Sequence, residues 1–269
     1  MTFTMGPALL FCPADRPERF RKAADRADAV ILDLEDAVGP DAKADARAAV
    51  AESGLDADRT IVRINPAGSP DFAADLAAVA AGGFHTVMLA KASGTADLVP
   101  LRDYRVVALC ETPAGVIAAP DIASVECVVA LMWGAEDLVG ALGGSSSRTP
   151  DGGYRDVARH ARASVLLAAG AHGIAAIDAV HLDIADEAGQ AAEATDAAAS
   201  GFAATACIHP GQVSVVREAY RPSEEELAAA RELLSAASGR DGVFTHDGRM
   251  IDAPVLRQAE RVVARAARR

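Results

Sequence analysis

Several short apolar segments of this sequence end in charged side chains, and two of these side chains are carboxylates that could bind a metal ion. Glu111 lies in LCETPAG and Asp137 in WGAEDL, and neither has a Cys or His beside it. Oxygen-only ligands suit a hard cation such as Mg²⁺, which commonly takes one or two protein carboxylates and completes its octahedron with water and substrate oxygens. The residues therefore predict a Mg²⁺ site, with a metal-free salt bridge to Arg63 or Lys91 as the alternative.

Two cationic residues follow other apolar segments. Arg63, in VRIN, offers a planar fork that can hold a carboxylate or an enolate oxygen, whereas Lys91 acts as a point charge. Several carboxylates around Lys91 would keep it protonated, which disfavours Schiff-base chemistry and favours an ion pair. In LDLEDAV, Asp33 and Glu35 share one face of a strand by the two-residue period, and Asp36 begins the loop. We expect these three acidic residues to support Arg63 or Lys91.

Three further features carry weaker signals. His209, in IHP, could be a general base, a metal ligand or a polar residue packed before a proline turn. The stretch 143–148, GGSSSR, could bind an anion through its backbone N–H groups or could be a flexible loop. The four cysteines lie far apart, without the close pairs of a zinc site or the density of a disulfide framework. We expect them to be core residues of a reduced, cytoplasmic protein.

The elements that must position these residues alternate between short strands and longer Ala-rich helices. Apolar runs rich in Val, Ile and Leu predict eight strands at 8–13, 29–34, 60–64, 86–90, 106–110, 125–132, 175–180 and 206–208. Helical periodicity predicts helices between them, among others at 18–24, 42–52, 72–81, 156–169 and 187–199. Eight strand–helix units predict an α/β fold, a (β/α)₈ TIM barrel, in which chemistry lies where the strands end.

A doubly wound open sheet is the competing fold. Such sheets usually bind a nucleotide through a Gly-rich turn after the first strand, but that turn here reads PADRPERF. The barrel is therefore favoured. After the eighth strand we expect a helix around 223–237, a polar Gly-containing stretch and a last helix from Pro254 onward. We assign residues 1–220 to the barrel and 221–269 to a C-terminal helical extension of the same domain.

Composition narrows the classes of partner. The formal charge of −12 disfavours binding to nucleic acid or to anionic lipid. No apolar run approaches the roughly 18 residues needed to span a bilayer, and the first ten residues lack the basic and apolar regions of a signal peptide. We expect a soluble protein whose partner is a small molecule.

Taken in order, LDLEDAV, VRIN, the ET after the fifth strand, WGAEDL, CIHP and the distal MIDAPVL resemble the citrate lyase β-subunit-like family of HpcH/HpaI-type aldolases. The resemblance spans nearly the whole chain, and GGSSSR and YRDVARH make it closest to stand-alone actinobacterial members. It implies a Mg²⁺-dependent carbon–carbon lyase that cleaves malyl-, citramalyl- or 3-hydroxy-3-methylglutaryl-CoA to acetyl-CoA and an oxo acid. It also implies two alternatives: a citrate lyase β subunit acting on citryl-acyl carrier protein, or a metal aldolase of free 4-hydroxy-2-oxo acids.

The resemblance also implies roles for individual residues. Glu111 and Asp137 match the family's Mg²⁺ ligands, and Arg63 matches the arginine that grips the carboxylate end of the substrate. Gly134 and Ala135 match positions whose backbone contacts the bound oxo acid. These five residues form the expected substrate half of the site.

Asp252, in MIDAPVL, matches an acidic residue that closes over a neighbouring subunit's site as the acid/base. That match implies a homo-oligomer, commonly a trimer. Read without the resemblance, an Asp followed by Ala253 and Pro254 is the N-cap of the last helix.

Two positions depart from the family pattern. Ala204-Thr205 stands where many relatives have Gly-Lys, and Pro7-Ala8 stands where Arg-Ser is common. We expect both to lie near the region that contacts CoA or the acyl carrier protein, which leaves the identity of the thiol carrier open. A non-catalytic metabolite-binding protein is the remaining alternative.

Overall fold

A computed structural model describes residues 3–238 and 242–267. The chain forms two compact units, Met1–Val216 and Arg217–Arg269. The first unit holds the predicted barrel, and the second holds the whole range that the sequence assigns to the C-terminal extension, 221–269, together with residues 217–220. That this extension belongs to the same domain stays a prediction.

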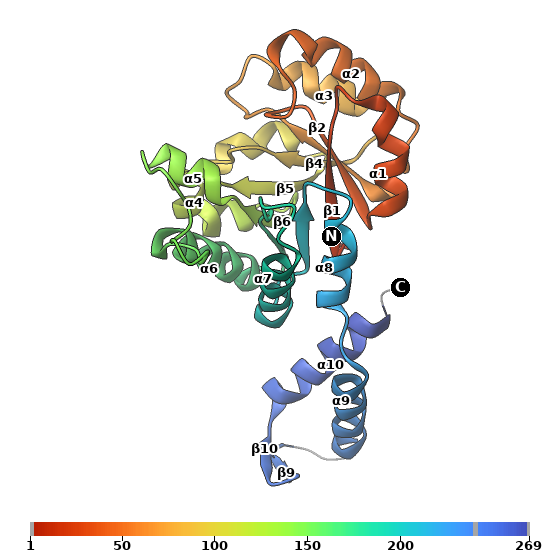
Figure 1. The fold of residues 1–269 in the computed structure, drawn as a ribbon, viewed down its shortest axis with the longest axis vertical. Helices are drawn as coiled ribbons and strands as arrows, with labels where there is room; N and C mark the ends of the chain where they lie inside the picture. The colour runs from red at the N-terminus through yellow and green to blue at the C-terminus, as the bar shows by residue number, and fades with distance from the viewer. Residues whose placement is uncertain (1–2, 239–241, 268–269) are drawn as a thin grey trace. The chain divides into compact units, whose positions relative to one another are not determined.

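The first unit is a closed barrel of eight parallel strands in sequence order, as predicted, with helices arranged around the strands (Figure 1). The strands are β1 (Ala8–Pro13), β2 (Ala29–Asp33), β3 (Thr60–Ile64), β4 (Thr86–Leu89), β5 (Arg105–Cys110), β6 (Val128–Trp133), β7 (Ala175–Asp178) and β8 (Ala204–Cys207). The barrel closes where β8 pairs with β1. All but a few strand residues are buried, which explains why the strands read as continuous apolar runs.

The residues that fill the interior of the barrel show which site residues point inward. One buried apolar cluster draws side chains from all eight strands, including Ile31 of β2, Ile61 of β3 and Leu109 of β5. Alternate residues of a strand face the same side. Asp33 follows Ile31 by two positions and Arg63 follows Ile61 by two, so both continue the inward-facing set at the carboxyl ends of their strands.

Helices and short 3₁₀ turns follow the strands of the barrel. The helices are α1 (Phe20–Arg26), α2 (Lys43–Glu52), α3 (Phe72–Ala81), α4 (Pro113–Ala123), α5 (Ala135–Ala141), α6 (Asp156–Ala171), α7 (Glu187–Ser200) and α8 (Gln212–Tyr220). The Thr112 hydroxyl caps α4 by accepting a hydrogen bond from the Gly115 N–H, with Pro113 at the first helical position. Between β4 and β5 the connection is a 3₁₀ helix, Thr95–Leu101, with Pro100 inside it.

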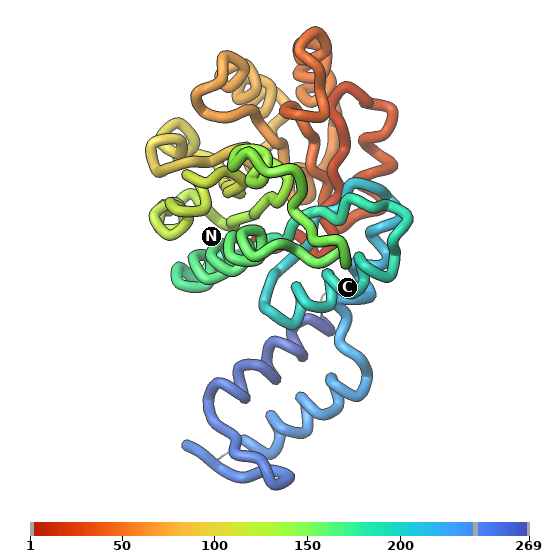
Figure 2. Tube along the Cα trace, turned by 60° about the vertical axis from the view of Figure 1, so that its left-hand side comes forward, coloured from red at the N-terminus to blue at the C-terminus, as the bar shows by residue number. Residues whose placement is uncertain are grey.

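After the end of α8, the described residues of the second unit form two helices and a short hairpin. Ser223 and Glu226 form a capping box that starts α9 (Glu224–Ala237), as the sequence predicts for a helix there. The polar stretch carries an antiparallel pair, β9 (Phe244–His246) and β10 (Arg249–Ile251), which the sequence analysis did not predict. The last helix is α10 (Ala253–Ala267), and it runs beside α9 (Figure 2).

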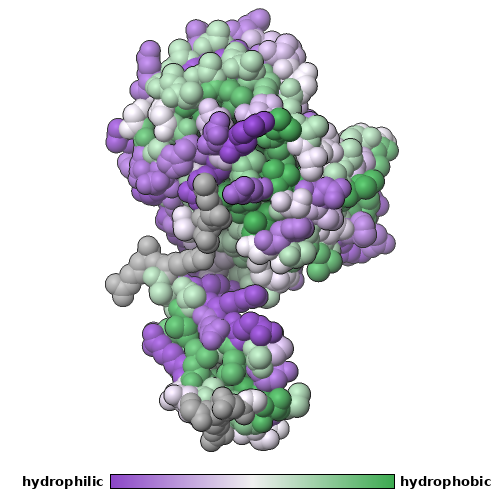
Figure 3. Space-filling view, turned by 180° about the vertical axis from the view of Figure 1, so that it is seen from behind, coloured by the Kyte–Doolittle hydropathy of each residue, from purple (hydrophilic) through white to green (hydrophobic). Residues whose placement is uncertain are grey.

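The second unit buries little apolar surface of its own. Ala230 is the one buried residue of α9, and among the described residues of α10 only Ala259 is buried. The apolar side chains Val255, Leu256 and Val262 of α10 are only half-buried. In Figure 3 hydrophobic side chains form a green run along one face of this unit.

Two expectations about buried positions have different outcomes. The four cysteines, Cys12, Cys110, Cys127 and Cys207, are free and buried, as expected. In contrast, the register pairs Ala8 with Thr205 at the amino-terminal ends of β1 and β8, and both residues are buried. Ala8 and Thr205 therefore lie in the barrel wall, and the expectation that the two departures lie near the thiol carrier stays a prediction. Within 3–238 and 242–267, no helix is long and apolar enough to cross a membrane.

Candidate active site

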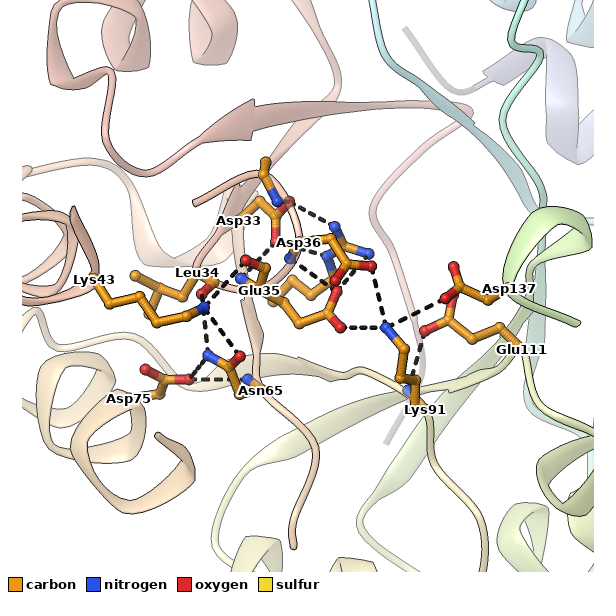
Figure 4. Close-up of polar contacts among 12 residues, drawn as sticks. Asp33, Leu34, Glu35, Asp36, Lys43, Asn65, Asp75, Lys91, Glu111 and Asp137 are labelled. Carbon is orange, nitrogen blue, oxygen red and sulfur yellow. Dashed lines mark hydrogen bonds and ion pairs between the residues drawn. The ribbon is translucent and has the colours of Figure 1, made fainter. Parts of the chain in front are cut away.

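Charged side chains from neighbouring strands meet at the carboxyl-terminal rim of the barrel (Figure 4). Asp33 is the last residue of β2 and Arg63 lies near the end of β3. Lys91 follows β4, Glu111 follows β5, and Asp137 lies in the first turn of α5 after β6. The structure thus brings together charged residues that are far apart in the sequence.

Arg63 is held mainly by Asp33. Its Nε donates to Asp33 Oδ1 at 2.7 Å and its NH2 donates to Asp33 Oδ2 at 2.6 Å. Glu35 Oε2 lies 3.2 Å from NH1, and the guanidinium carbon lies 4.9 Å from the centre of the Phe11 ring. Burial alone would lower the pKa of Arg63, but the hydrogen bond and charge of Asp33 raise it, so the residue stays charged. One edge of the fork is therefore committed to Asp33, and a substrate can use only the remaining N–H groups.

Lys91 links the acidic residues of the two sides of the rim. Its Nζ donates to a Glu35 carboxylate oxygen and, at 3.1 Å, to Asp36 Oδ2, and it lies 3.4 Å from Asp137 Oδ1. Burial lowers the pKa of Lys91, but the hydrogen bond to Glu35 and the nearby carboxylates raise it well above its ordinary value. The backbone of Lys91 has φ of 51°, a left-handed conformation that costs a non-glycine residue energy and is concentrated at functional sites.

Glu111 is buried beside other charges. Its Oε1 accepts a hydrogen bond of 3.1 Å from the backbone N–H of Lys91. Burial, followed by the charge of Asp137, raises the pKa of Glu111 to about 8, against the opposing charges of Lys91 and Arg63. Gly134 lies directly against it, because a Cβ at that position would be 2.9 Å from both Cβ and Oε2 of Glu111. A glycine is therefore needed where β6 passes the Glu111 carboxylate.

The donor set of Glu111 and Asp137 fits the predicted Mg²⁺. Both residues offer only carboxylate oxygens, which a hard cation prefers. Glu111 is 3% exposed, whereas the side chain of Asp137 is 37% exposed, so one oxygen donor lies inside the barrel and the other faces solvent. Burial, followed by the negative charge of Asp137, raises the pKa of Glu111. A divalent cation bound between the two carboxylates would offset both effects.

The loop that follows α5 is tied down by side-chain contacts. Ser147 is buried and its hydroxyl donates to Glu136 Oε1 at 2.6 Å. Arg148 lies 4.0 Å above the Tyr154 ring and pairs with Glu193. The charge of Arg148 is thus already compensated, and these contacts do not favour the flexible-loop interpretation of GGSSSR.

His209 lies in a turn after β8. The ring Nδ1 of His209 accepts a hydrogen bond of 3.1 Å from the Gly211 backbone N–H. The backbone N–H of His209 donates to Gln212 Oε1 at 3.1 Å. These contacts match the interpretation of His209 as a polar residue of a proline turn.

Asp252 belongs to the second unit and lies at the start of α10. Its Oδ1 accepts a hydrogen bond of 3.2 Å from the Val255 N–H, which is the contact of an N-cap. Asp252 therefore caps α10, and a further role as acid/base stays a prediction.

Two groups of polar residues near the strand ends were missed by the sequence analysis. Asp178, at the end of β7, accepts hydrogen bonds from Trp133 Nε1 at 2.6 Å and from Arg162 NH2 at 2.8 Å. Lys43 of α2 and Asp75 of α3 form a second group, shown in Figure 4. Arg162, Lys43 and Asp75 lie in helices, where a polar side chain has no signal in the sequence that separates it from a solvent-exposed one.

Comparisons with known proteins agree with this geometry. Residues 8–210 match the model of a family described as HpcH/HpaI aldolase/citrate lyase. The chain is 55% identical to a citrate lyase subunit beta-like protein of Mycobacterium tuberculosis, over 97% of this chain and 96% of the relative. It is 32% identical to the L-malyl-CoA/beta-methylmalyl-CoA lyase of Cereibacter sphaeroides, over 99% and 98%. The crystal structure of M. tuberculosis CitE with magnesium, acetoacetate and coenzyme A superimposes with a TM-score of 0.93, at 55% identity and with 98% of each chain covered.

Proposed function

The chain belongs to the HpcH/HpaI aldolase/citrate lyase family and is a carbon–carbon lyase, and we propose that it cleaves a β-hydroxyacyl-CoA to acetyl-CoA and an oxo acid with Mg²⁺ at Glu111 and Asp137. Malyl-, citramalyl- and 3-hydroxy-3-methylglutaryl-CoA are the substrate class. The magnesium, acetoacetate and coenzyme A in the M. tuberculosis structure support the cofactor, the oxo-acid product and the thiol carrier.

One observation carries the proposal: two carboxylates that suit a hard cation lie beside two permanently charged cations at the barrel rim. Lys91 contacts both carboxylates: its backbone N–H donates to Glu111, and its Nζ lies 3.4 Å from Asp137 Oδ1. Arg63 lies on the adjoining strand and is held in place by Asp33. A substrate with a carboxylate and a neighbouring hydroxyl can bridge such a metal site and such a cation.

Arg63 binds and orients the carboxylate end of the substrate in this proposal. A guanidinium has five N–H groups, of which two bond to Asp33, and NH1 also lies 3.2 Å from Glu35 Oε2. The N–H groups that these carboxylates leave free are the ones that can bind the substrate carboxylate. The backbone at Gly134 and Ala135, where α5 begins, contacts the same oxo acid by resemblance to the family. Lys91 offsets the carboxylates around it, so that an anionic substrate does not meet uncompensated negative charge.

Cleavage breaks the bond between the hydroxyl-bearing carbon and the carbon next to the thioester. When bound, Mg²⁺ supplies Lewis-acid chemistry that acidifies the hydroxyl and stabilises negative charge on its oxygen. The hydroxyl proton leaves to solvent, the electron pair of the broken bond moves to the thioester as an enolate, and the oxo acid is formed. Arg63, which stays charged, stabilises the charge on oxygen. A proton delivered to the enolate carbon then gives acetyl-CoA.

We assign that proton to Asp252 of a neighbouring copy in a homotrimer. The resemblance to the CoA lyases supports this role of Asp252. The partly exposed apolar side chains of α10 support an oligomer. Val255, Leu256 and Val262 leave part of the apolar side of α10 uncovered within the unit. Apolar surface of this kind is stabilised by packing against another surface.

The test is an assay of the purified protein with Mg²⁺ against a panel of substrates, with acetyl-CoA and oxo acids measured by mass spectrometry. The panel holds the three hydroxyacyl-CoA types, citryl-acyl carrier protein and free 4-hydroxy-2-oxo acids. We expect Mg²⁺-dependent release of acetyl-CoA from at least one hydroxyacyl-CoA and no turnover after treatment with EDTA. Turnover of citryl-acyl carrier protein or free oxo acids alone would replace the proposal with one of those activities, and no turnover at all would refute it.

A further inference from the structure

Lys43 makes three hydrogen bonds below the rim of the barrel. From the start of α2, its Nζ donates to the carbonyl oxygens of Leu34 at 2.7 Å and Glu35 at 3.2 Å, and to Asn65 Oδ1 at 3.1 Å. An ammonium group has three N–H donors, so these acceptors use all of them. Two of the acceptors are backbone atoms of the turn that follows β2 (Figure 4).

Asn65 and Asp75 complete the same cluster. Asn65 Nδ2 donates to Leu34 O at 3.0 Å and to Asp75 Oδ2 at 2.6 Å, and the Asn65 N–H donates to the same Asp75 oxygen at 2.9 Å. Asp75 is fully buried, and its other oxygen accepts from Arg47 Nε at 2.7 Å. A buried carboxylate with three donors is a satisfied, rigid group. The cluster therefore joins α2, α3 and the end of β3 to the backbone of the turn.

The turn at 34–38 is organised around the side chains that hold Arg63. The Glu35 N–H donates to Asp33 Oδ1 at 2.9 Å and the Ala37 N–H to Asp33 Oδ2 at 3.2 Å. The Asp36 N–H donates to Glu35 Oε2 at 3.0 Å. Asp33 and Glu35 are the same residues that contact Arg63, so the direction of the guanidinium depends on the path of this turn.

We propose that Lys43, Asn65 and Asp75, the Lys43 anchor, are positioning residues that hold the turn at 34–38 and thereby aim Arg63 at the carboxylate of the substrate. The proposal deepens the function proposed above and rests on it for the role of Arg63. Lys43 has no direct contact with the guanidinium in this proposal and acts through the groups to which it bonds, the backbone of Leu34 and Glu35 and the side chain of Asn65.

The chain offers a matched control because it has only three lysines, Lys22, Lys43 and Lys91. Lys43→Met keeps an unbranched side chain of similar length and removes all three donors, whereas Lys22→Met makes the same change at an exposed position of α1. Lys43→Arg keeps the charge but replaces a compact three-donor group with a planar one. It serves as the second variant if Lys43→Met does not fold.

Two measurements on the full-length protein report on the anchor. Hydrogen exchange followed by mass spectrometry measures how firmly the amides of residues 34–38 are held. Titration calorimetry with pyruvate or acetoacetate in saturating Mg²⁺ measures oxo-acid binding, and titration with Mg²⁺ alone measures the metal site. We expect Lys43→Met to exchange faster at 34–38 and to bind oxo acid about 10- to 100-fold more weakly, since small displacements of a binding group have effects of this size. Mg²⁺ affinity should be unchanged, and Lys22→Met should match the parent throughout.

The outcomes separate this inference from the proposed function. Faster exchange at 34–38 together with weaker oxo-acid binding at unchanged Mg²⁺ affinity supports the anchor, even if the parent cleaves none of the tested thioesters. Parent-like exchange, or faster exchange with parent-like oxo-acid binding, overturns it even if the parent is an active lyase. If the parent binds no oxo acid, the proposed function fails and exchange at 34–38 alone decides whether the anchor holds the turn.

Discussion

Replacing Arg63 with lysine tests the substrate half of the site directly. In the structure, Nε and NH2 of Arg63 bond to the two oxygens of Asp33 at 2.7 and 2.6 Å, and NH1 lies 3.2 Å from Glu35. A lysine places its donors on a single atom, so it cannot span Asp33 and also present a fork to a substrate. Arg63→Lys should therefore lose part of the contact with Asp33 and part of the contact with the oxo acid.

The size of both losses follows from the number of hydrogen bonds. A hydrogen bond to a charged group contributes about 1.5–3 kcal/mol. One such bond lost to the substrate weakens oxo-acid binding about 10- to 150-fold. One lost to Asp33 lowers the free energy of unfolding by about 1.5–3 kcal/mol. Asp33 keeps its two backbone donors, Glu35 N–H and Ala37 N–H, so we expect the variant to remain folded.

Arg162→Lys is the matched control. Arg162 Nε and NH2 bond to Asp178 at 3.0 and 2.8 Å, and the side chains of this pair are 18% and 7% exposed, against 12% and 2% for Arg63 and Asp33. The two variants should lose similar stability in urea unfolding. Only Arg63→Lys should weaken oxo-acid binding in titration calorimetry and lower kcat/KM for the best hydroxyacyl-CoA.

The reasoning is refuted if Arg63→Lys binds oxo acid and turns over substrate like the parent while losing the same stability as Arg162→Lys. Arg63 would then be a structural residue, and the substrate carboxylate would have to bind elsewhere on the rim.

Four further predictions concern the metal site and the proton donor. Asp137→Ala should abolish Mg²⁺-dependent cleavage without unfolding the protein, because its side chain is 37% exposed and lies outside the packed core. Gly134→Ala should lower Mg²⁺ affinity about 10- to 100-fold, as changes to residues that support a ligand do, because the new methyl group meets Glu111 at 2.9 Å. Mg²⁺ binding measured by calorimetry should strengthen about tenfold per pH unit up to about pH 8, since the pKa of Glu111 is raised to about 8 and the metal requires the carboxylate. Asp252→Asn, which keeps a capping oxygen but not the acid, should retain Mg²⁺ and oxo-acid binding while cleavage falls about 10²- to 10⁴-fold.

Two further variants serve as controls for the metal site. Asp156→Ala removes an exposed carboxylate of α6, and Gly140→Ala adds a methyl group to open space on α5, so both should behave like the parent. Cleavage by EDTA-treated protein, or parent-like Mg²⁺ affinity in Gly134→Ala, would contradict the assigned ligands. Mg²⁺ affinity that does not change between pH 6 and pH 8 would show that Glu111 does not bind the metal.

The raised pKa of Glu111 also predicts how the free energy of unfolding of the metal-free protein changes with pH. Between pH 4.5, the ordinary value, and about pH 8, the folded state holds a proton that the unfolded state has lost. The contribution of Glu111 to the free energy of unfolding therefore falls as pH rises through this window, and Mg²⁺ should restore it. Thermal unfolding with EDTA and with Mg²⁺ at both ends of the window measures the difference.

The role of Asp252 across a subunit boundary is tested by mixing. By prediction Asp137→Ala is inactive and Asp252→Asn is about 10²- to 10⁴-fold slower. A mixed oligomer, however, contains sites with an intact barrel from one copy and an intact Asp252 from another. Partial recovery of activity after subunit exchange is the expected result. No recovery despite demonstrated exchange, or a fully active Asp252→Asn, would leave Asp252 as the cap of α10 alone.

The order of the strand–helix units and the direction of several site residues were determined by the sequence itself. Both depend on local spacing, because short apolar runs of three to eight residues that alternate with segments of helical periodicity predict the units. The two-residue period of a strand then carries Asp33 and Arg63 to the inward side. These relations hold within a few residues of the chain, so they can be derived without knowing which strands become neighbours.

Which side chains touch was decided only by closure of the barrel. Lys91 and Glu35 are 56 residues apart, and Arg63 and Asp33 are 30 apart, yet each pair forms an ion pair at the rim. The sequence identified these as charged residues at strand ends but could not show that Asp33 takes one edge of the Arg63 fork. Pairing distances of this kind follow from strand register and tilt, which no local pattern encodes.

The same limit explains the positions that were missed. Lys43 and Asp75 lie in helices, where a polar residue facing inward looks like one facing solvent until the helices pack against the strand ends. Strand register likewise places Ala8 against Thr205 inside the barrel wall, a pairing between the two ends of the barrel sequence that no local pattern shows. Local spacing therefore shows which charged residues lie at the end of each strand. Their burial and their contacts with residues of distant segments, which balance the charges of the site, form only when the barrel closes.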